Sequence, residues 1–344
     1  MFQKKFILSI LTAFIMTLII SSCKKHTSEP EEYSPDLPRS ISCITVKDSF
    51  LYIGTWGGGI FKLNTKTGKA ENFLPPDYNN YWVRSIAIDT LGKIWVGTYN
   101  NLYIFDERTW TTVTGFYGDY ASRIIKDKNH NIWFTSYKVK YNFFGRMDEG
   151  RGIIKFDGQS FTTYNPFGLA NFSALTFDLN NNLWCGSSNF NFTEAFVVKY
   201  DGQNWTIFDS SNSNFPKIYG IYSMGVDKSN NVWIGGSEKD GIFKFDGVNV
   251  TIYNKNNSIL PFNRADDIVV DKSGNVWFAL YDVNAHDGAL AKFDGNNWTI
   301  YRKENSGLPS NYVRALAVDE NGVLWIGTDV GLVRYDGTNW FFYK

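Results

Sequence analysis

A repeated pairing of an aspartate with a tryptophan constrains the fold of this chain more than any other feature. Six copies place the Asp six residues before the Trp: Asp89 and Trp95, Asp127 and Trp133, Asp178 and Trp184, Asp227 and Trp233, Asp271 and Trp277, and Asp319 and Trp325. A seventh copy, LYIGTW, has Tyr52 at the Trp position. The copies recur every 38 to 51 residues. This period, with short alternating apolar runs, indicates a radial array of small β-sheets.

Each repeat contains four short segments with the alternating pattern of β-strands. In the second copy they are residues 84–88, 93–98, 102–105 and 110–113. Turns such as DKSGN favour a tight hairpin between the first two strands. A four-stranded sheet cannot cover both of its faces alone, so the copies are expected to close a ring. The sequence therefore predicts an all-β, seven-bladed β-propeller of four-stranded antiparallel blades over residues 39–344, closed by packing of the first blade on the last.

The N-terminal segment is typical of a bacterial lipoprotein. Lys4 and Lys5 precede an apolar run over residues 6–20, which ends in SSC. That run is shorter than the roughly 20 residues that span a bilayer, and Cys23 follows two small residues. We expect a signal peptide over residues 1–22, lipidation of Cys23 and a flexible, Pro-rich tether over residues 23–38. An uncleaved anchor is the alternative.

This segment predicts the location of the mature protein. The lipid would hold it at the bacterial cell envelope without a spanning helix, at the outer membrane in our interpretation. The periplasmic and the surface side both remain open. Lys and Arg together number 34, as do Asp and Glu, so there is no electrostatic case for binding nucleic acid.

The sequence offers little material for a metal site or a disulfide. Cys43 and Cys185 fall in the first and fourth blades, too far apart to bridge. The Asp-rich turns lack the Glu that a calcium loop requires. The three histidines, His26, His130 and His286, lie in unrelated segments. We expect no metal, no cofactor and no catalysis.

The last repeat carries a resemblance to a known family. GLPSNYVRALAVDENGVLWIGTDVGLVRYDG, at residues 307–337, resembles the two-component regulator propeller repeat, which is known from periplasmic sensor domains. The resemblance implies an extracytoplasmic recognition propeller of a kind often tied to glycan sensing. It does not imply that this chain transmits a signal, because the kinase modules of such sensors have no counterpart in the repeats.

The variable face of the propeller is the expected binding surface. Turns between strands one and two, and between three and four, are short and alike, so variation collects where the other loops and the blade linkers emerge. The loops between strands two and three are expected to be long in blades three, four and six, at residues 136–152, 187–196 and 280–290. Of the 12 Trp residues, ten occupy anchor positions in second or fourth strands. The remaining two, Trp56 and Trp82, should reach the variable face, where indole rings stack on sugars or peptides. Alternatively, they fill the joint between two blades.

Further candidates lie around the expected mouth of the central channel. They are Tyr81, Arg84, Arg123, Tyr219, Tyr222, Asp266, Asp267, Tyr312 and Arg314. Arg side chains there could bind a carboxylate or sugar hydroxyls with two donors at once. Alternatively, they are paired with Asp or with backbone carbonyls as part of the rim.

We interpret the chain as a non-catalytic recognition module that binds a glycan or an envelope protein. One alternative is a structural or assembly partner in an outer-membrane complex. Another is a propeller hydrolase or lyase, although fold alone warrants no activity. Streptogramin lyases have a similar strand pattern but call for inward His residues and a metal site. Sialidases space the Asp and Trp of their repeat by five, whereas the spacing here is six. The oligomeric state is left open.

Overall fold

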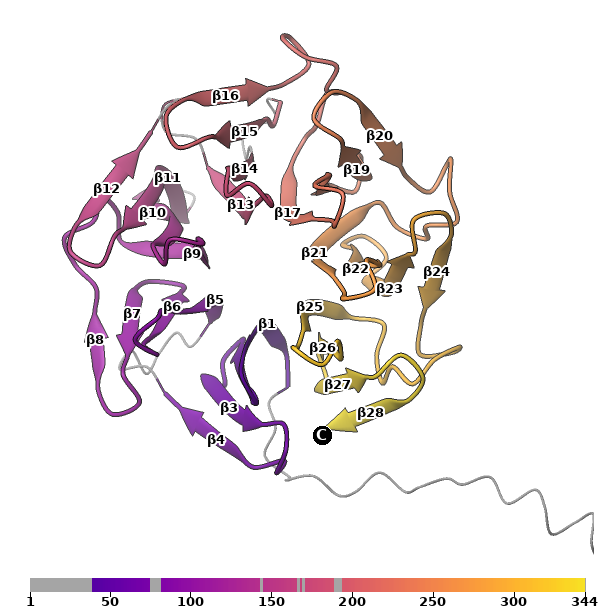
Figure 1. The fold of residues 1–344 in the computed structure, drawn as a ribbon, viewed down its shortest axis with the longest axis horizontal. Coiled ribbons are helices and arrows are strands. Elements are labelled where there is room, and N and C mark those ends of the chain that lie inside the picture. The colour runs from indigo at the N-terminus through magenta and orange to yellow at the C-terminus, as the bar shows by residue number, and fades with distance from the viewer. Residues whose placement is uncertain are drawn as a thin grey trace, which may run out of the picture. The chain divides into compact units, whose positions relative to one another are not determined.

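The computed structural model describes residues 39–74, 82–142, 145–165, 168, 171–188 and 194–343. The expected signal peptide, Cys23, the tether and Tyr81 lie outside the described residues. Within them the strands form seven antiparallel sheets of four strands each. Figure 1 shows these sheets as blades around a central axis. The prediction of an all-β, seven-bladed propeller is confirmed.

Each blade consists of four consecutive strands. Blade one contains β1 (Ile41–Lys47), β2 (Phe50–Thr55), β3 (Ile60–Asn64) and β4 (Ala70–Phe73); blade two contains β5 (Val83–Ile88), β6 (Ile94–Thr98), β7 (Leu102–Phe105) and β8 (Trp110–Thr112). Blade three contains β9 (Tyr120–Lys126), β10 (Ile132–Asn142), β11 (Gly145–Phe156) and β12 (Phe161–Tyr164); blade four contains β13 (Phe172–Phe177), β14 (Leu183–Ser187), β15 (Val197–Tyr200) and β16 (Trp205–Phe208). Blade five contains β17 (Ile221–Val226), β18 (Val232–Gly236), β19 (Ile242–Phe245) and β20 (Val250–Tyr253); blade six contains β21 (Arg264–Val270), β22 (Val276–Asp282), β23 (Asp287–Phe293) and β24 (Trp298–Tyr301). Blade seven contains β25 (Val313–Val318), β26 (Leu324–Thr328), β27 (Leu332–Tyr335) and β28 (Trp340–Tyr343).

The first strand of every blade lies nearest the axis and the fourth lies outermost (Figure 1). The ring closes by packing of blade one on blade seven, where Ile41 shares a buried cluster with Ala315 and Trp325. The Ser40 N–H also donates to the Asp329 carbonyl at 2.9 Å. Each of these two sheets uses only its own four strands, so closure needs no exchanged strand.

The repeated Asp and Trp form one hydrogen-bonded unit at the turn after each first strand. In blade five the Trp233 indole N–H donates to Asp227 Oδ2 at 2.9 Å, and Asp227 Oδ1 accepts the N–H groups of Ser229 and Asn231. The other five pairs have the same Trp-to-Asp bond, at 2.9 to 3.2 Å. The carboxylate thus ties the turn to a buried ring, and the motif is structural.

Neighbouring blades approach closely where small residues follow the Trp anchors. A Cβ built on Gly235 would lie 2.4 Å from the Ala265 carbonyl oxygen of the next blade, and one on Gly97 would lie 2.4 Å from that of Ala121. Only a residue without a side chain permits this contact. These glycines let the second strand of one blade pack against the innermost strand of the next blade.

The two described cysteines are core residues. Cys43 and Cys185 are buried free thiols in separate hydrophobic clusters. Burial raises the pKa of both, that of Cys43 to about 12. Neither is activated as a nucleophile.

Two segments expected as long loops form strands instead. β10 and β11 stay paired from Ile132 and Phe156 out to Asn142 and Gly145. β22 and β23 likewise pair as far as Asp282 and Asp287. Pairing satisfies backbone groups that a long loop would leave to solvent, so blades three and six carry extended hairpins on the variable face. Residues 189–193 of the expected blade-four loop lie outside the described residues.

Candidate binding site at the channel mouth

A β-bulge in the innermost strand of every blade builds a ring of side chains at the channel mouth. In β5 the register passes from Val83 opposite Thr98 to Ser85 opposite Gly97, which leaves Arg84 without a partner. In blade three, Ser122 and Arg123 lie between paired positions opposite the single residue Thr135. At the same register position the seven blades present Ser42, Arg84, Ser122, Ser173, Tyr222, Asp266 and Arg314. Bulges redirect side chains, and all seven of these line one cavity.

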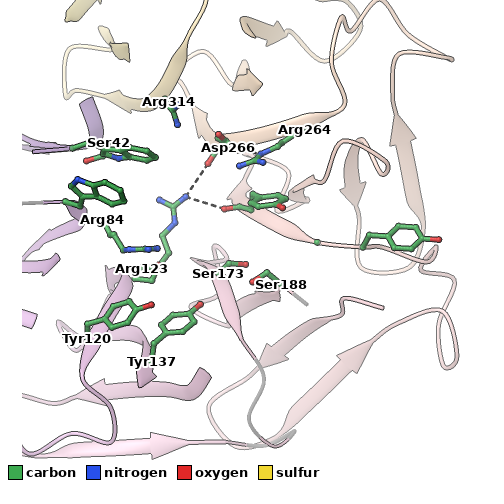
Figure 2. Close-up of a pocket in the computed structure, with 16 residues that line it drawn as sticks. Ser42, Arg84, Tyr120, Arg123, Tyr137, Ser173, Ser188, Arg264, Asp266 and Arg314 are labelled. Atoms are coloured by element: carbon green, nitrogen blue, oxygen red, sulfur yellow. Dashed lines mark hydrogen bonds and ion pairs between the residues drawn. The ribbon is translucent and has the colours of Figure 1, made fainter. Parts of the chain in front are cut away.

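The cavity has a volume of about 400 Å³, which is within the range of small-molecule sites. Linkers, second-strand ends and the blade-three bulge complete its wall with Trp56, Trp82, Tyr120, Arg123, Tyr137, Ser188, Tyr219, Gly220 and Arg264. Figure 2 shows Tyr120 and Arg123 on one side of the channel and Arg264 on the other. The cavity therefore opens on the face opposite the short turns, as the distribution of variable loops predicts.

The two Trp residues left over from the repeat form a pair at the rim. Trp56 and Trp82 are joined by an isolated β-bridge, and their rings stack with centroids 5.6 Å apart and planes inclined by 19°. Their side chains stay 48% and 45% exposed. They therefore brace the joint between blades one and two and also present apolar surface to the cavity.

Two arginines flank this aromatic pair. The Arg314 guanidinium lies 4.6 Å from the Trp56 ring centroid. On the other side Trp82 packs edge-on against Tyr99 at 5.2 Å, and Arg84 lies 5.0 Å from the Tyr99 ring. A continuous series of contacts thus runs from Arg314 through three aromatic rings to Arg84.

Arg123 crosses the channel and forms the floor of the cavity. From blade three, its Nη2 donates to the carbonyl oxygen of Tyr222 at 3.5 Å and to that of Asp266 at 3.4 Å (Figure 2). It also lies 4.0 Å from Asp267 Oδ1. Asp267 Oδ2 accepts the N–H of Leu316 at 2.8 Å. Burial raises the pKa of Asp267 despite the opposing charge of Arg123 and these N–H donors.

The opposite wall carries a paired cluster of charges. Arg264 Nε donates to Asp266 Oδ1 at 2.6 Å, and Arg264 Nη1 donates to Glu238 Oε1 at 3.0 Å. The guanidinium also covers the Tyr222 ring at 4.0 Å. Burial raises the pKa of Tyr222, against the effect of the Arg264 charge. Asp266 is therefore held in an ion pair.

The structure brings together most of the residues that the sequence singles out. Eight of them line the cavity: Trp56, Trp82, Arg84, Arg123, Tyr219, Tyr222, Asp266 and Arg314. Asp267 lies behind the wall, and Tyr312 packs on Tyr281 at 5.4 Å outside the lining. Tyr81 lies outside the described residues. Sequence reasoning missed Arg264, Tyr120 and Tyr137 and the serines of the ring.

The signal for the missed residues is present in the repeat register. Aligning the first strands puts Trp82, Tyr120, Arg264 and Tyr312 at one position, directly before the buried residue that precedes each bulge. The bulge ring occupies the position two residues further along each strand. A comparison of registers, rather than a choice of residue types, would have found both sets.

The site contains few groups for acid–base or metal chemistry. Asp266 is the carboxylate in its wall. His130 lies in the turn between β9 and β10, and His286 lies in the β22–β23 turn. Among the described residues, no group of three or more His, Cys, Asp or Glu side chains could hold a metal ion. The same residues include no helix long and apolar enough to cross a membrane.

Comparison with solved structures shows the same fold in proteins of different roles. A catalytically inactive variant of virginiamycin B lyase from Staphylococcus aureus with quinupristin is 16% identical, has a TM-score of 0.67, and aligns over 88% of this chain and 96% of its own. YCF48 bound to D1 peptide is 12% identical, has a TM-score of 0.61, and aligns over 87% and 94%. At these identities the likeness shows the fold alone.

A third structure with a similar fold comes from a two-component system. The extracellular domain described as that of a hybrid two-component system from B. thetaiotaomicron is 19% identical, with a TM-score of 0.52. The alignment covers 86% of this chain but 45% of that domain. No curated protein sequence matches the chain.

The family model of the two-component regulator propeller matches residues 77–100 and 307–330. These segments contain the linker and inner strands of blades two and seven, the two blades that supply Arg84 and Arg314. Two repeats of this seven-bladed propeller thus match the two-component regulator propeller, one at each of the blades that hold these arginines.

Proposed function

We propose that this protein is an extracytoplasmic, lipid-anchored recognition module that binds a saccharide at the channel mouth without transforming it. The observation that carries the proposal is the half-exposed Trp56–Trp82 pair at the edge of a 400 Å³ cavity. Apolar C–H faces of sugars pack on such rings. The serines, tyrosines and arginines of the wall supply the donors and acceptors that hydroxyl groups require.

The charges in the wall support binding rather than catalysis. Glycoside hydrolysis requires two carboxyl groups, one of which must donate a proton. Asp266 is bonded to Arg264, and Asp267 accepts backbone N–H groups on both oxygens. Neither carboxylate is free to act on a substrate in this arrangement.

The location is part of the same proposal. Residues 1–23 have the pattern of a lipoprotein signal, and one structure with a similar fold is described as the extracellular domain of a two-component system. Mass spectrometry of the membrane fraction tests this point. A diacylglyceryl-modified peptide beginning at Cys23 supports it, and an intact N-terminal Met1 peptide contradicts it.

A saccharide-binding measurement tests the function. The full chain in detergent micelles is applied to a glycan array, and affinities for captured glycans are measured by calorimetry. A Trp56→Ala, Trp82→Ala double variant should weaken binding about tenfold or more, because each aromatic contact is worth about 0.5–1.5 kcal/mol. Trp56→Phe, Trp82→Phe keeps a stack and should retain part of the affinity.

The matched control changes an aromatic residue away from the mouth. Phe341 is 36% exposed on the outermost strand of blade seven, and Phe341→Ala should leave affinity unchanged. If the double alanine variant binds as tightly as the wild type, Trp56 and Trp82 do not form the binding surface. Absence of any glycan signal, together with stoichiometric capture of one envelope protein, would favour the assembly-partner alternative.

A lyase is the second candidate, because virginiamycin B lyase has the same fold over 88% of this chain. A His-to-Ala variant of that enzyme is catalytically inactive, whereas His130 and His286 are not among the residues lining the cavity here. Incubation with quinupristin, followed by mass spectrometry, separates the two functions. We expect the compound to be recovered intact. Turnover that disappears in Arg84→Ala or His286→Ala would establish the enzyme instead.

A further inference from the structure

The arginines around the cavity are not equivalent in their bonding. Arg264 is bonded to Asp266 and Glu238, and Arg123 is bonded to two carbonyl oxygens and lies beside Asp267. Among the described residues, no carboxylate lies within 4.0 Å of the Arg84 or Arg314 guanidinium, and neither group donates a hydrogen bond. Two guanidinium groups therefore enter the cavity with their donors unused.

Aromatic stacking holds these two groups in place without using their N–H edges. Arg314 lies 4.6 Å from the Trp56 ring, and Arg84 lies 5.0 Å from Tyr99 and 5.6 Å from Tyr120. A guanidinium stacked on a ring face keeps its planar fork of donors available in its own plane. The rings also restrict the side chains, which lowers the entropy that ligand binding would cost.

The charges divide the cavity into two halves. Arg84, on blade two, and Arg314, on blade seven, stand on either side of blade one. The carboxylates of Asp266 and Glu238 lie at blades five and six, where Arg264 lies between two acids. The half beside Trp56 and Trp82 is therefore positive, whereas in the half beside Tyr222 the charge of Arg264 is compensated by acids.

We infer that the ligand is an acidic saccharide held in the positive half of the cavity, where the donors of Arg84 and Arg314 bind its carboxylate groups and its sugar rings pack toward Trp56 and Trp82. A carboxylate accepts two parallel bonds from one guanidinium fork. The hydroxyl end of the ligand faces the Ser and Asp266 side of the ring. This inference rests on the proposed function and specifies the ligand class of the same site.

The test compares sugars that differ only in charge. Uronic-acid oligosaccharides are titrated into the full chain beside the methyl esters of the same oligosaccharides, and a neutral and a sulfated series complete the panel. We expect the acids to bind at least tenfold more tightly than their esters. The preference should shrink as salt is raised, because screening weakens exposed charge interactions.

The variants separate charge recognition from a general loss of binding. Arg84→Gln, Arg314→Gln should abolish the preference for the acid over the ester. The double control Arg108→Gln, Arg334→Gln also removes two positive charges, in the exposed β7–β8 turn and on β27, where Arg334 faces Asp336. It should keep the preference. Circular dichroism of the variants confirms that each retains its sheet content.

Each outcome decides a different point. Equal binding of acids and esters would overturn the acidic-ligand inference and leave saccharide recognition standing. Selective binding of sulfated sugars would show that the recognised group is a sulfate ester and not a carboxylate. Failure of every member of the panel to bind would overturn both the inference and the proposed function. Retention of the acid preference by the double Gln variant would remove Arg84 and Arg314 from the site.

Discussion

The guanidinium of Arg123 in blade three lies 3.4 Å from the carbonyl oxygen of Asp266 in blade six, across the central channel. The same group reaches the Tyr222 carbonyl of blade five. One side chain thus connects three blades that sequence separates widely. Arg123 thus links blades across the channel. Within the part of the chain that the structure describes, the N–H groups of Arg84 and Arg314 donate no hydrogen bond.

Removing this side chain should destabilise the propeller. Arg123→Ala leaves two carbonyl oxygens without this donor and the half-buried Asp267 without its cation. Loss of partners for buried polar groups costs about 1–3 kcal/mol, so the free energy of unfolding from urea titration should fall by about that amount. Arg108→Ala, an exposed change in the β7–β8 turn, is the control. Equal stability of the two variants would contradict the bridging role.

The architecture was predictable because the fold depends on periodic features that any single sequence displays. Asp227 and Trp233, repeated at constant spacing, specify a turn and an anchor wherever they occur. Arg123 could not be distinguished from Arg84 in this way, since both follow the same kind of linker. What separates them is a long-range bond to Tyr222 in another blade, and nothing local in the sequence encodes that distance.

The same limit explains the extended hairpins. The sequence predicts a long loop after Ser136, because the connection between second and third strands varies in length among the repeats. In the structure it pairs with itself as far as Asn142 and Gly145. Pairing is decided by the partner strand and not by composition, so the period of alternation was the better guide.

A methyl group at an inter-blade contact should be poorly tolerated. In Gly235→Ala the new Cβ would lie 2.4 Å from the Ala265 carbonyl oxygen and 2.3 Å from Ser223 Oγ. Overpacking of this kind costs about 1–3 kcal/mol, so we expect a lower melting temperature. Gly220→Ala is the matched control, since its Cβ would meet only Tyr222 at an ordinary 3.5 Å. Equal melting temperatures of the two variants would show that the blades are less tightly packed than the contact implies.

The Asp–Trp unit should matter more for stability than for binding. Asp227→Ala leaves the Trp233 indole N–H, which is 1% exposed, and two backbone N–H groups without their acceptor. We expect the free energy of unfolding to fall by about 1–3 kcal/mol, while saccharide affinity of the folded fraction is unchanged. Glu320→Ala, at an exposed turn position, should be neutral. An affinity loss in Asp227→Ala without a stability loss would place the motif in the binding function instead.

Acid should destabilise the protein through the turns between third and fourth strands. Hydrogen bonds from backbone N–H groups hold the pKa of Asp201, Asp246 and Asp294 below its usual range. Because these groups have a lower pKa folded than unfolded, their contribution is present above the unfolded value of about 3.9 and disappears as pH falls through the folded value. Burial raises the pKa of Asp267, so its protonation at low pH favours the folded state. Three turn carboxylates have the opposite effect, so we expect their contribution to be the larger one.

The urea concentration at the midpoint of unfolding should therefore decrease as the pH is lowered from 5 to 3. The triple variant Asp201→Asn, Asp246→Asn, Asp294→Asn keeps an acceptor oxygen at each turn but cannot titrate, so its midpoint should depend less on pH over this interval. Glu320→Gln removes one exposed carboxylate without such bonds and should follow the wild type. A triple variant as acid-sensitive as the wild type would show that the proton uptake occurs elsewhere, and Asp178 and Asp271, whose pKa is also lowered, would be the next groups to replace.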